Sequence, residues 1–211
     1  MEFWTRDLLD NYMHSIEVVK EAQRRQMFSG ALRAELADYR AVDVLAAHAR
    51  KAPIGSGLSL VSYLDFKTYL VDDILTKVDR ASMANSLEVR VPILDHSFVE
   101  WASAIPADLK MTVGGDGKFI FKKALESHLP HDILYRKKKG FSVPLRRWFQ
   151  GELRSRVQNM LHSEILRDSG YMSARYLDQM AARLDRNWYE CSSQLWAMLM
   201  FESFLKSSSS R

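Results

Sequence analysis

The sequence has one cysteine, Cys191, and no long apolar segment. A single cysteine excludes a disulfide within the chain and is typical of proteins in a reducing cytoplasm. The longest apolar run, 195–201, has seven residues, whereas a membrane-spanning helix needs about 20. The first residues also lack the basic, apolar and small-residue series of a secretion signal. We therefore expect a cytoplasmic protein that does not bind a membrane.

The sequence also lacks a large excess of positive or negative charge. The 211 residues include 30 Lys and Arg against 26 Asp and Glu, which gives a formal net charge of +4. Domains that bind nucleic acid usually show a stripe of basic residues instead of a small surplus, so the balance indicates an anionic ligand at most. Hydrophobic residues make up 47% and charged residues 27%. This ordinary globular mixture argues against long disordered segments.

Apolar residues recur at helical spacing along most of the chain, and no convincing series of alternating strand residues occurs. The sequence therefore predicts a mainly α fold. The expected helices cover residues 1–28, 31–50, 58–70, 72–87, 117–128, 145–162 and 173–206. We expect a single unit over 1–206 and a frayed tail over 207–211.

Local signals set several boundaries of these elements. Asp72 is expected to cap the helix over 72–87, and Asp95 to cap a short helix that ends near Ile105. Residues 89–94 are expected to be extended, because Pro92 disfavours helix at the residue before it. The helix over 72–87 should bury an apolar stripe made of Ile74, Leu75, Val78, Ala81 and Leu87.

The same stretch of sequence contains charges in an unusual pattern. Asp73, Lys77 and Arg80 are spaced so that they share one face of a helix, opposite the apolar stripe. Glu88 and Arg90 lie two residues apart in an otherwise apolar segment, where charges are costly unless they are paired or bind a ligand. On the residues alone we prefer a structural interpretation, with a solvated helix face and an ion pair between Glu88 and Arg90.

A second charged feature is the segment 135–148, which has six positive and no negative side chains. Lysine supplies a mobile positive charge, glycine allows close backbone approach, and the following helix N-terminus favours anions, so the segment suits a polyphosphate. Lys118, which follows a glycine-rich turn, could join the same site. Ordinary surface lysines are one alternative. A nucleic-acid patch is another, with Tyr135, Phe141 and Trp148 as stacking groups.

Two further features do not indicate a chemical site. His128 and His131 have no Cys, Glu or Asp at metal-ligand spacing, so no metal site is expected within this chain. Residues 114–117 are rich in glycine but lack the Lys-Ser/Thr ending of a phosphate-binding Walker loop. We expect a tight turn there.

The motifs along this region resemble a known family. The elements Asp-Asp-Ile-Leu, Lys-Val-Asp-Arg, Ser-Met-Ala, Leu-Glu-Val-Arg-Val-Pro and Leu-Asp-His follow one another in register over 72–96, and Lys-Lys-Gly-Phe-Ser-Val-Pro follows at 138–144. Together they resemble the C-terminal synthetase region of glutamine-dependent asparagine synthetases, most densely over 58–148. The resemblance implies the helical C-terminal part of an α/β adenine-nucleotide α-hydrolase-like (ATP pyrophosphatase) synthetase domain, whose parallel sheet lies mostly upstream.

The resemblance also implies a reaction and its site residues. ATP adenylates the side-chain carboxylate of aspartate, and ammonia from a glutaminase domain attacks the acyl-adenylate to give asparagine, AMP and pyrophosphate, with Mg²⁺ bridging the phosphates. Lys138 is implied to stabilise charge on the adenylate and pyrophosphate, and Lys118 to lie near the leaving pyrophosphate. Asp72 or Asp73 matches an acidic position on the acceptor side. Glu88 and Arg90, in contrast, are implied to be supports behind the site.

Three elements of a full family member are absent: a cysteine nucleophile for glutamine hydrolysis, a Ser-Gly-Gly-x-Asp-Ser loop, and a later acidic motif that supports Mg²⁺. We therefore expect part of a larger ligase, inactive alone, with an exposed apolar face where the sheet would pack. The alternatives are a non-catalytic helical partner of the same descent, or an amidotransferase with another carboxylate acceptor. A nucleic-acid binder is disfavoured by the carboxylates of Asp72, Asp73 and Asp79. A homodimer of the complete enzyme is left open.

Overall fold

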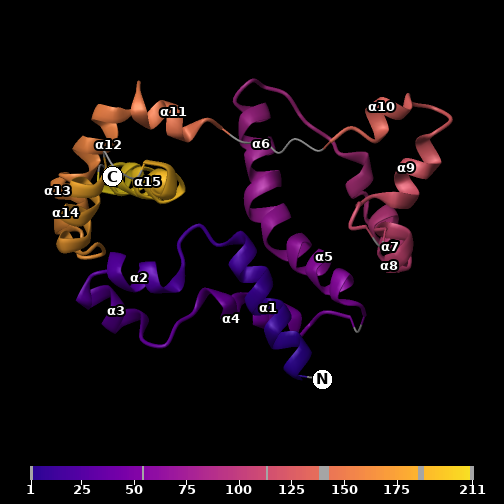
Figure 1. Cartoon of the computed structure of the whole chain (residues 1–211), viewed down its shortest axis with the longest axis horizontal. Helices are drawn as coiled ribbons and strands as arrows, with labels where there is room; N and C mark the ends of the chain where they lie inside the picture. Colours follow the sequence, from indigo (N-terminus) through magenta and orange to yellow (C-terminus); the bar gives the residue numbers. More distant parts are fainter. Residues whose placement is uncertain (1, 54, 113, 138–142, 185–187, 210–211) are drawn as a thin grey trace. The chain divides into compact units, whose positions relative to one another are not determined.

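The computed structural model describes residues 2–53, 55–112, 114–137, 143–184 and 188–209, and only the backbone of 2–6, 188–191 and 209. The chain divides into two compact units. Unit 1 consists of Met1–Tyr12 and Ala41–Lys139, and unit 2 of Met13–Arg40 and Gly140–Arg211. The described residues form helices, two isolated β-bridges and no strand, which confirms the predicted mainly α fold (Figure 1). The single domain expected over 1–206 stays a prediction.

Unit 1 contains the first part of α1 and then a series of short helices. Its elements are α1 (Glu2–Ile16), α4 (Ala41–Ala49), α5 (Gly57–Lys67), the π-helix η1 (Leu70–Leu75), α6 (Thr76–Met83), the 3₁₀ turn η2 (Pro92–Leu94), α7 (His96–Ala104), α8 (Ala107–Lys110), α9 (Phe119–Leu125) and α10 (His131–Leu134). Within the described residues, no helix has both the length and the apolar character needed to cross a membrane.

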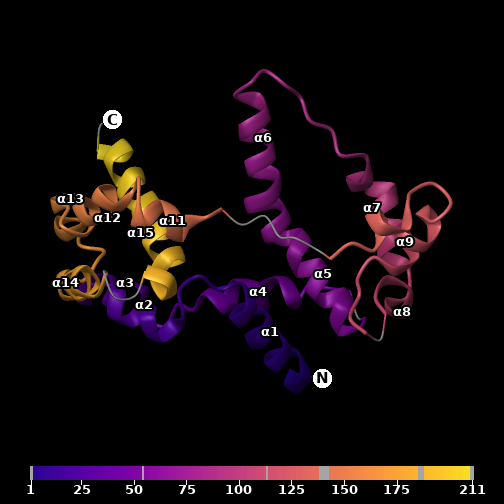
Figure 2. The same cartoon turned by 45° about the horizontal axis from the view of Figure 1, so that its top comes forward.

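Helix α5 leads into η1 and α6 (Figures 1 and 2), with a break at Thr68, whose φ of −130° and ψ of −82° are not helical. Ser56 starts α5, because its side-chain oxygen accepts a hydrogen bond from the backbone N–H of Ser59. The expectation that Asp72 caps a new helix was wrong. The backbone N–H of Asp72 donates to the carbonyl of Thr68 at 2.9 Å, so Asp72 lies inside a continuing helix.

The connection between α6 and α7 follows the sequence signals in part. Asp95 caps α7 as predicted, since its carboxylate accepts from the backbone N–H groups of Ser97 and Phe98. The extended segment, however, reaches only Val91. The backbone N–H of Leu94 donates to the carbonyl of Val91 at 2.9 Å and closes a 3₁₀ turn, because Pro92 is favourable as the first residue of a helical turn.

Unit 2 combines the rest of α1 and two short helices with the C-terminal part of the chain. Its other elements are α2 (Glu21–Met27), α3 (Gly30–Leu36), α11 (Leu145–Gln150), α12 (Arg154–Leu161), α13 (Glu164–Asp168), α14 (Ala174–Arg183) and α15 (Trp188–Ser209). The predicted helices over 1–28, 31–50 and 145–162 are thus each divided in two, and the helix predicted over 173–206 corresponds to α14 and α15. One division lies at Ala37, whose φ of +46° cannot continue a right-handed helix.

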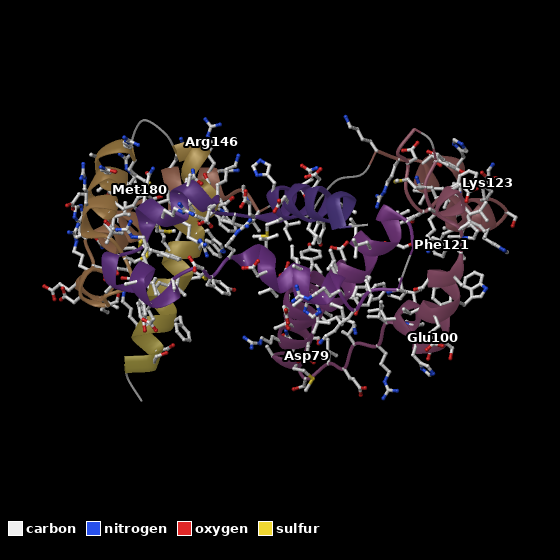
Figure 3. All side chains as sticks on the ribbon, turned by 90° about the horizontal axis from the view of Figure 1, so that it is seen from below. Asp79, Glu100, Phe121, Lys123, Arg146 and Met180 are labelled. Atoms are coloured by element: carbon white, nitrogen blue, oxygen red, sulfur yellow. The ribbon has the colours of Figure 1, made fainter. Side chains whose placement is uncertain are left out.

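The buried side chains are concentrated in unit 2. Its core is a cluster of fully or nearly buried apolar residues from α2, α11, α12, α13, α14 and α15, and α14 contributes Met180 to it (Figure 3). Leu177 of α14 and Leu195 of α15 have no exposed surface. Burying one such side chain stabilises the folded state by about 1.5–3 kcal/mol, so this cluster accounts for the cohesion of unit 2.

Unit 1 has a much smaller core. Its buried apolar side chains are Leu9, Tyr12, Leu45 and Leu64, from α1, α4 and α5. No described residue between 65 and 137 is buried. The expected stripe on 72–87 is therefore only partly covered, and Leu87 at its end is 61% exposed.

Candidate functional site

Asp72 and Asp73, the two predicted acidic site residues, lie in the π-helix η1. The side-chain hydroxyl of Thr76, the first residue of α6, donates to the carbonyl of Val71 at 2.9 Å and so ties the end of η1 to its second residue. Short π segments inside α-helices are frequently found at functional sites. Sequence reasoning identified the two carboxylates but missed the π-helix, because apolar periodicity does not distinguish this backbone register from an α-helix.

The carboxylate of Asp73 has a partner on the next turn. Its Oδ1 lies 3.6 Å from the Nζ of Lys77, and both side chains are more than half exposed. The expected solvated helix face is therefore confirmed, and the exposed pair on it contributes only about 0.3–0.5 kcal/mol. Asp72 is also exposed and has no ion pair within the described part of the chain. That Asp72 or Asp73 lies on the acceptor side of the site stays a prediction.

Lys118, the second predicted phosphate residue, is the N-cap of α9 in a left-handed conformation, with φ of +62°. A compact turn precedes it. The isolated bridge between Met111 and Gly117 closes this turn, and the hydroxyl of Thr112 accepts from the backbone N–H of Asp116 at 3.1 Å. The tight turn expected at 114–117 is thus confirmed, and it fixes the backbone from which Lys118 extends.

A hydrogen-bonded network between α9 and α10 was not expected from the sequence. The hydroxyl of Tyr135 donates to Glu126 at 2.6 Å, and the ammonium of Lys123 lies 2.9 Å from the same carboxylate oxygen. The ammonium of Lys122 lies 5.4 Å from the centre of the Tyr135 ring, on which His131 stacks. Lys123 is labelled in Figure 3. The only sequence signal for this network was that its residues lie close together in the chain, on either side of a proline turn.

These contacts perturb the network's protonation equilibria. The hydrogen bonds from Tyr135 and Lys123 hold the pKa of Glu126 below its usual value, and the bond to Glu126 raises the pKa of Tyr135. Because Tyr135 is engaged on both its hydroxyl and its ring, it is not a ready stacking platform for a nucleic-acid base. The network instead fixes the backbone at Tyr135, where the basic segment 135–148 begins.

Glu88 and Arg90 form the ion pair that the sequence predicted. The Nε of Arg90 donates to the Oε1 of Glu88 at 2.8 Å. Both side chains are more than two-thirds exposed, so water screens the pair and its contribution to stability is small. Their role as supports behind a site stays a prediction.

The basic segment is only partly described. Lys138 and Phe141, the predicted phosphate ligand and stacking group, lie outside the described residues. Arg136 and Lys137 precede them in unit 1 and are exposed. Pro144 is the N-cap of α11, next to the first-turn positions that proline favours.

The described site residues are thus separate charged groups on exposed elements. Lys118 makes no hydrogen bond or ion pair with Asp72 or Asp73 within the described ranges. Exposed carboxylates and ammonium groups can bind and orient charged substrates, but a catalytic centre also needs groups that exclude water and converge on the reacting atoms. The described part of unit 1 supplies charged groups, but it does not enclose a space that would exclude water from a substrate.

Comparisons with known proteins identify the family. A family model described as asparagine synthase matches residues 3–206. The chain is 32% identical over 194 residues to glutamine-hydrolysing asparagine synthetase 1 of Bacillus subtilis (strain 168), and the match covers 92% of this chain and 30% of that protein.

Two shorter matches are to asparagine synthetase 3 of the same organism, with 48% identity over 73 residues, and to the Gallus gallus enzyme, with 38% identity over 76 residues. Each covers 35% of this chain, and they cover 12% and 13% of the respective relatives. No solved structure was found to match.

The chain spans about a third or less of the length of the curated relatives it matches. The family model nevertheless covers nearly all of its residues, including every site residue proposed from the sequence. The resemblance inferred from the motifs over 72–96 and 138–144 is confirmed, and the helical fold fits a helical part of such a domain. The chain belongs to the asparagine synthase family.

Proposed function

We propose that this chain is the helical C-terminal part of a longer ATP-dependent ligase that converts aspartate to asparagine. The observation that carries the proposal is the continuous family match over 3–206. The similarity to a protein named as a glutamine-hydrolysing asparagine synthetase, over 92% of this chain, supports the same reaction.

The charged groups of unit 1 fit the chemistry of adenylation. Attack of the aspartate carboxylate on the α-phosphate of ATP forms an acyl-adenylate and releases pyrophosphate, and ammonia then displaces AMP. Negative charge accumulates on the phosphates, where the ammonium groups of Lys138 and Lys118 would stabilise it. The carboxylate of Asp72 or Asp73 would orient the ammonium of the acceptor aspartate.

The residues present fit a magnesium ion that the nucleotide carries. The described part of the chain contains no group of three or more His, Cys, Asp or Glu side chains that could hold a metal ion. Mg²⁺ commonly binds through substrate phosphates with only one or two protein carboxylates. When bound, the ion would be held mainly by the ATP phosphates and would supply positive charge there.

The surface of unit 1 supports the view that further polypeptide completes the site. Val89, Val91 and Ile93 are 50%, 38% and 57% exposed, and Phe98 and Trp101 on α7 are 40% and 60% exposed. We call these five side chains the apolar face. The rings of Phe98 and Trp101 lie 5.5 Å apart, and contiguous exposed apolar groups are typical of surfaces that another chain segment covers.

The occupant that we propose for the apolar face is the remaining part of the same ligase. A stand-alone helical scaffold, the main alternative, would need polar side chains at this place, and the observed ones are apolar. The acceptor is proposed to be aspartate because the relatives are named asparagine synthetases; an enzyme that amidates another carboxylate is the second possibility within the same chemistry.

The test is ATP–pyrophosphate exchange in the complete enzyme that the proposal requires. Lys138→Ala should abolish aspartate-dependent exchange and leave glutamine hydrolysis largely intact, because the two reactions occur in different domains. Lys137→Ala, which removes an adjacent and exposed ammonium, is the matched control and should retain exchange. Wild-type exchange in Lys138→Ala would remove this lysine from the mechanism.

A further inference from the structure

Unit 2 contains a cavity that the proposed ligase chemistry does not use. Its volume is about 380 Å³, and it is lined from three helices by the guanidinium-bearing side chains of Arg25 on α2, Arg33 on α3 and Arg175 on α14. None of the described residues that line it is Asp or Glu. A volume of this size falls within the range of about 300–1,000 Å³ that is usual for small-molecule sites.

The inner wall of the cavity is held by hydrogen bonds between two distant connections of the chain. The backbone N–H of Ser29 donates to the carbonyl of Tyr171 at 2.9 Å, and the N–H of Ser173 donates to the carbonyl of Met27 at 2.8 Å, on either side of the bridge between Phe28 and Met172. Because these bonds fix α2 and α3 against the start of α14, the three arginines extend from one rigid wall.

The partners of the three arginines leave positive charge available. Arg25 donates to Glu21 at 3.0 Å, which offsets part of its charge. The Nε of Arg33 donates to the backbone carbonyl of Ser29 at 3.3 Å, and among the described residues this arginine has no ion pair. Arg175 is exposed and has no ion pair within the part of the chain that the structure describes.

The remaining lining favours a small ligand over a bare ion. Phe28 and Tyr176 add apolar atoms to the lining, and Ser173 supplies a polar group. Guanidinium groups bind phosphate and carboxylate through paired N–H donors, and they also stack on flat groups. We propose that this cavity binds a small organic oxyanion, a phosphate or carboxylate compound, with Arg175 and Arg33 as its main ligands.

Titration calorimetry on the 211-residue chain tests the proposal, with inorganic phosphate and malonate as probes. We expect saturable binding of at least one probe at one site per chain, with a Kd of about 10 mM or below. Arg175→Gln should weaken that binding about tenfold, because hydrogen bonds to charged groups are lost. Arg183→Gln is the matched control: it changes the same charge at the other end of α14, away from the cavity lining.

A second variant tests the cavity without removing an arginine. A Cβ at Gly30, which also lines the cavity, would meet no atom within 4 Å, so Gly30→Glu can introduce a competing carboxylate without a clash. It should abolish binding and leave the melting temperature unchanged or higher. If phosphate binds more tightly than malonate, the ligand is a phosphate compound, and if malonate binds more tightly, it is a carboxylate compound. Absence of saturable binding, or equal weakening in Arg175→Gln and Arg183→Gln, overturns the proposal.

Discussion

Glu202 is the most completely buried charged side chain described, and its replacement gives the sharpest test of how unit 2 is held together. It lies on α15 with 1% of its side chain exposed. Its Oε1 is 2.8 Å from the Nζ of Lys206, and its Oε2 is 2.8 Å from a guanidinium nitrogen of Arg156 on α12. The carboxylate therefore joins α15 to α12 through Arg156, whereas Lys206 pairs with it within α15.

The magnitude of the effect follows from the exposure of those partners. Glu202→Gln keeps the side-chain volume but removes the negative charge, so two charge-assisted contacts are lost. The contact with Lys206 is worth about 1.5–3 kcal/mol when fully desolvated, and the contact of Arg156 with Oε2 is an ion pair without a hydrogen bond. Because both cations are about 40% exposed, water recovers part of the loss. We expect the free energy of unfolding at pH 7 to fall by about 2 kcal/mol.

The same contacts set the pH dependence of this loss. Burial alone would raise the pKa of Glu202, but hydrogen bonds from Lys206 and Ser163 and the charge of Arg156 outweigh it and hold the pKa below its usual value. A lowered pKa in the folded state stabilises the protein above the pKa of the unfolded chain, about 4.3. This stabilisation is lost as the pH falls through the folded-state pKa, so the difference between wild type and Glu202→Gln should shrink toward pH 2.

Urea unfolding followed by circular dichroism, at pH 7 and at pH 2–3, measures both effects. Glu152→Gln makes the same change of charge at an exposed position in unit 2 and should alter stability by less than about 0.5 kcal/mol. The reasoning would be refuted by a Glu202→Gln variant as stable as wild type at pH 7, or by a loss that is independent of pH.

Three further outcomes follow from the fold and the site. In hydrogen exchange by mass spectrometry, amides over 65–137 should exchange faster than those of α12 and α14, since the first region has no buried described side chain and the others contribute to the core; equal protection would contradict this. Lys118→Gly should change the free energy of unfolding by less than about 1 kcal/mol, because glycine adopts the left-handed conformation readily, but should reduce ATP–pyrophosphate exchange in the complete enzyme. Calorimetry of the 211-residue chain with ATP should show no saturable binding at physiological concentration, and saturation would mean that the nucleotide site is more local than proposed.

Features set by neighbouring residues were predictable from the sequence. The Asp95 cap, the turn at 114–117 and the pair of Glu88 with Arg90 each depend on side chains within a few positions of one another. Their energetics are local, so the sequence specifies them directly.

Features set by tertiary contacts or by backbone register were not predictable. The π-helix that contains Asp72 has the same apolar periodicity as an α-helix, and the division at Ala37 depends on one positive φ. The expected burial of Leu87 failed because no described segment of unit 1 covers it. The arginine-lined cavity is formed by residues about 140 positions apart in the sequence, and no short-range sequence pattern predicts that they lie close together.

The central claim is that this chain is one part of a longer asparagine synthase-type ligase. The most direct measurement is to sequence the DNA upstream of the Met1 codon and read it in frame. The account predicts an open frame that encodes a glutaminase domain beginning with cysteine, followed by a Ser-Gly-Gly-x-Asp-Ser loop. An in-frame stop codon just upstream, with a ribosome-binding site for Met1, would contradict it.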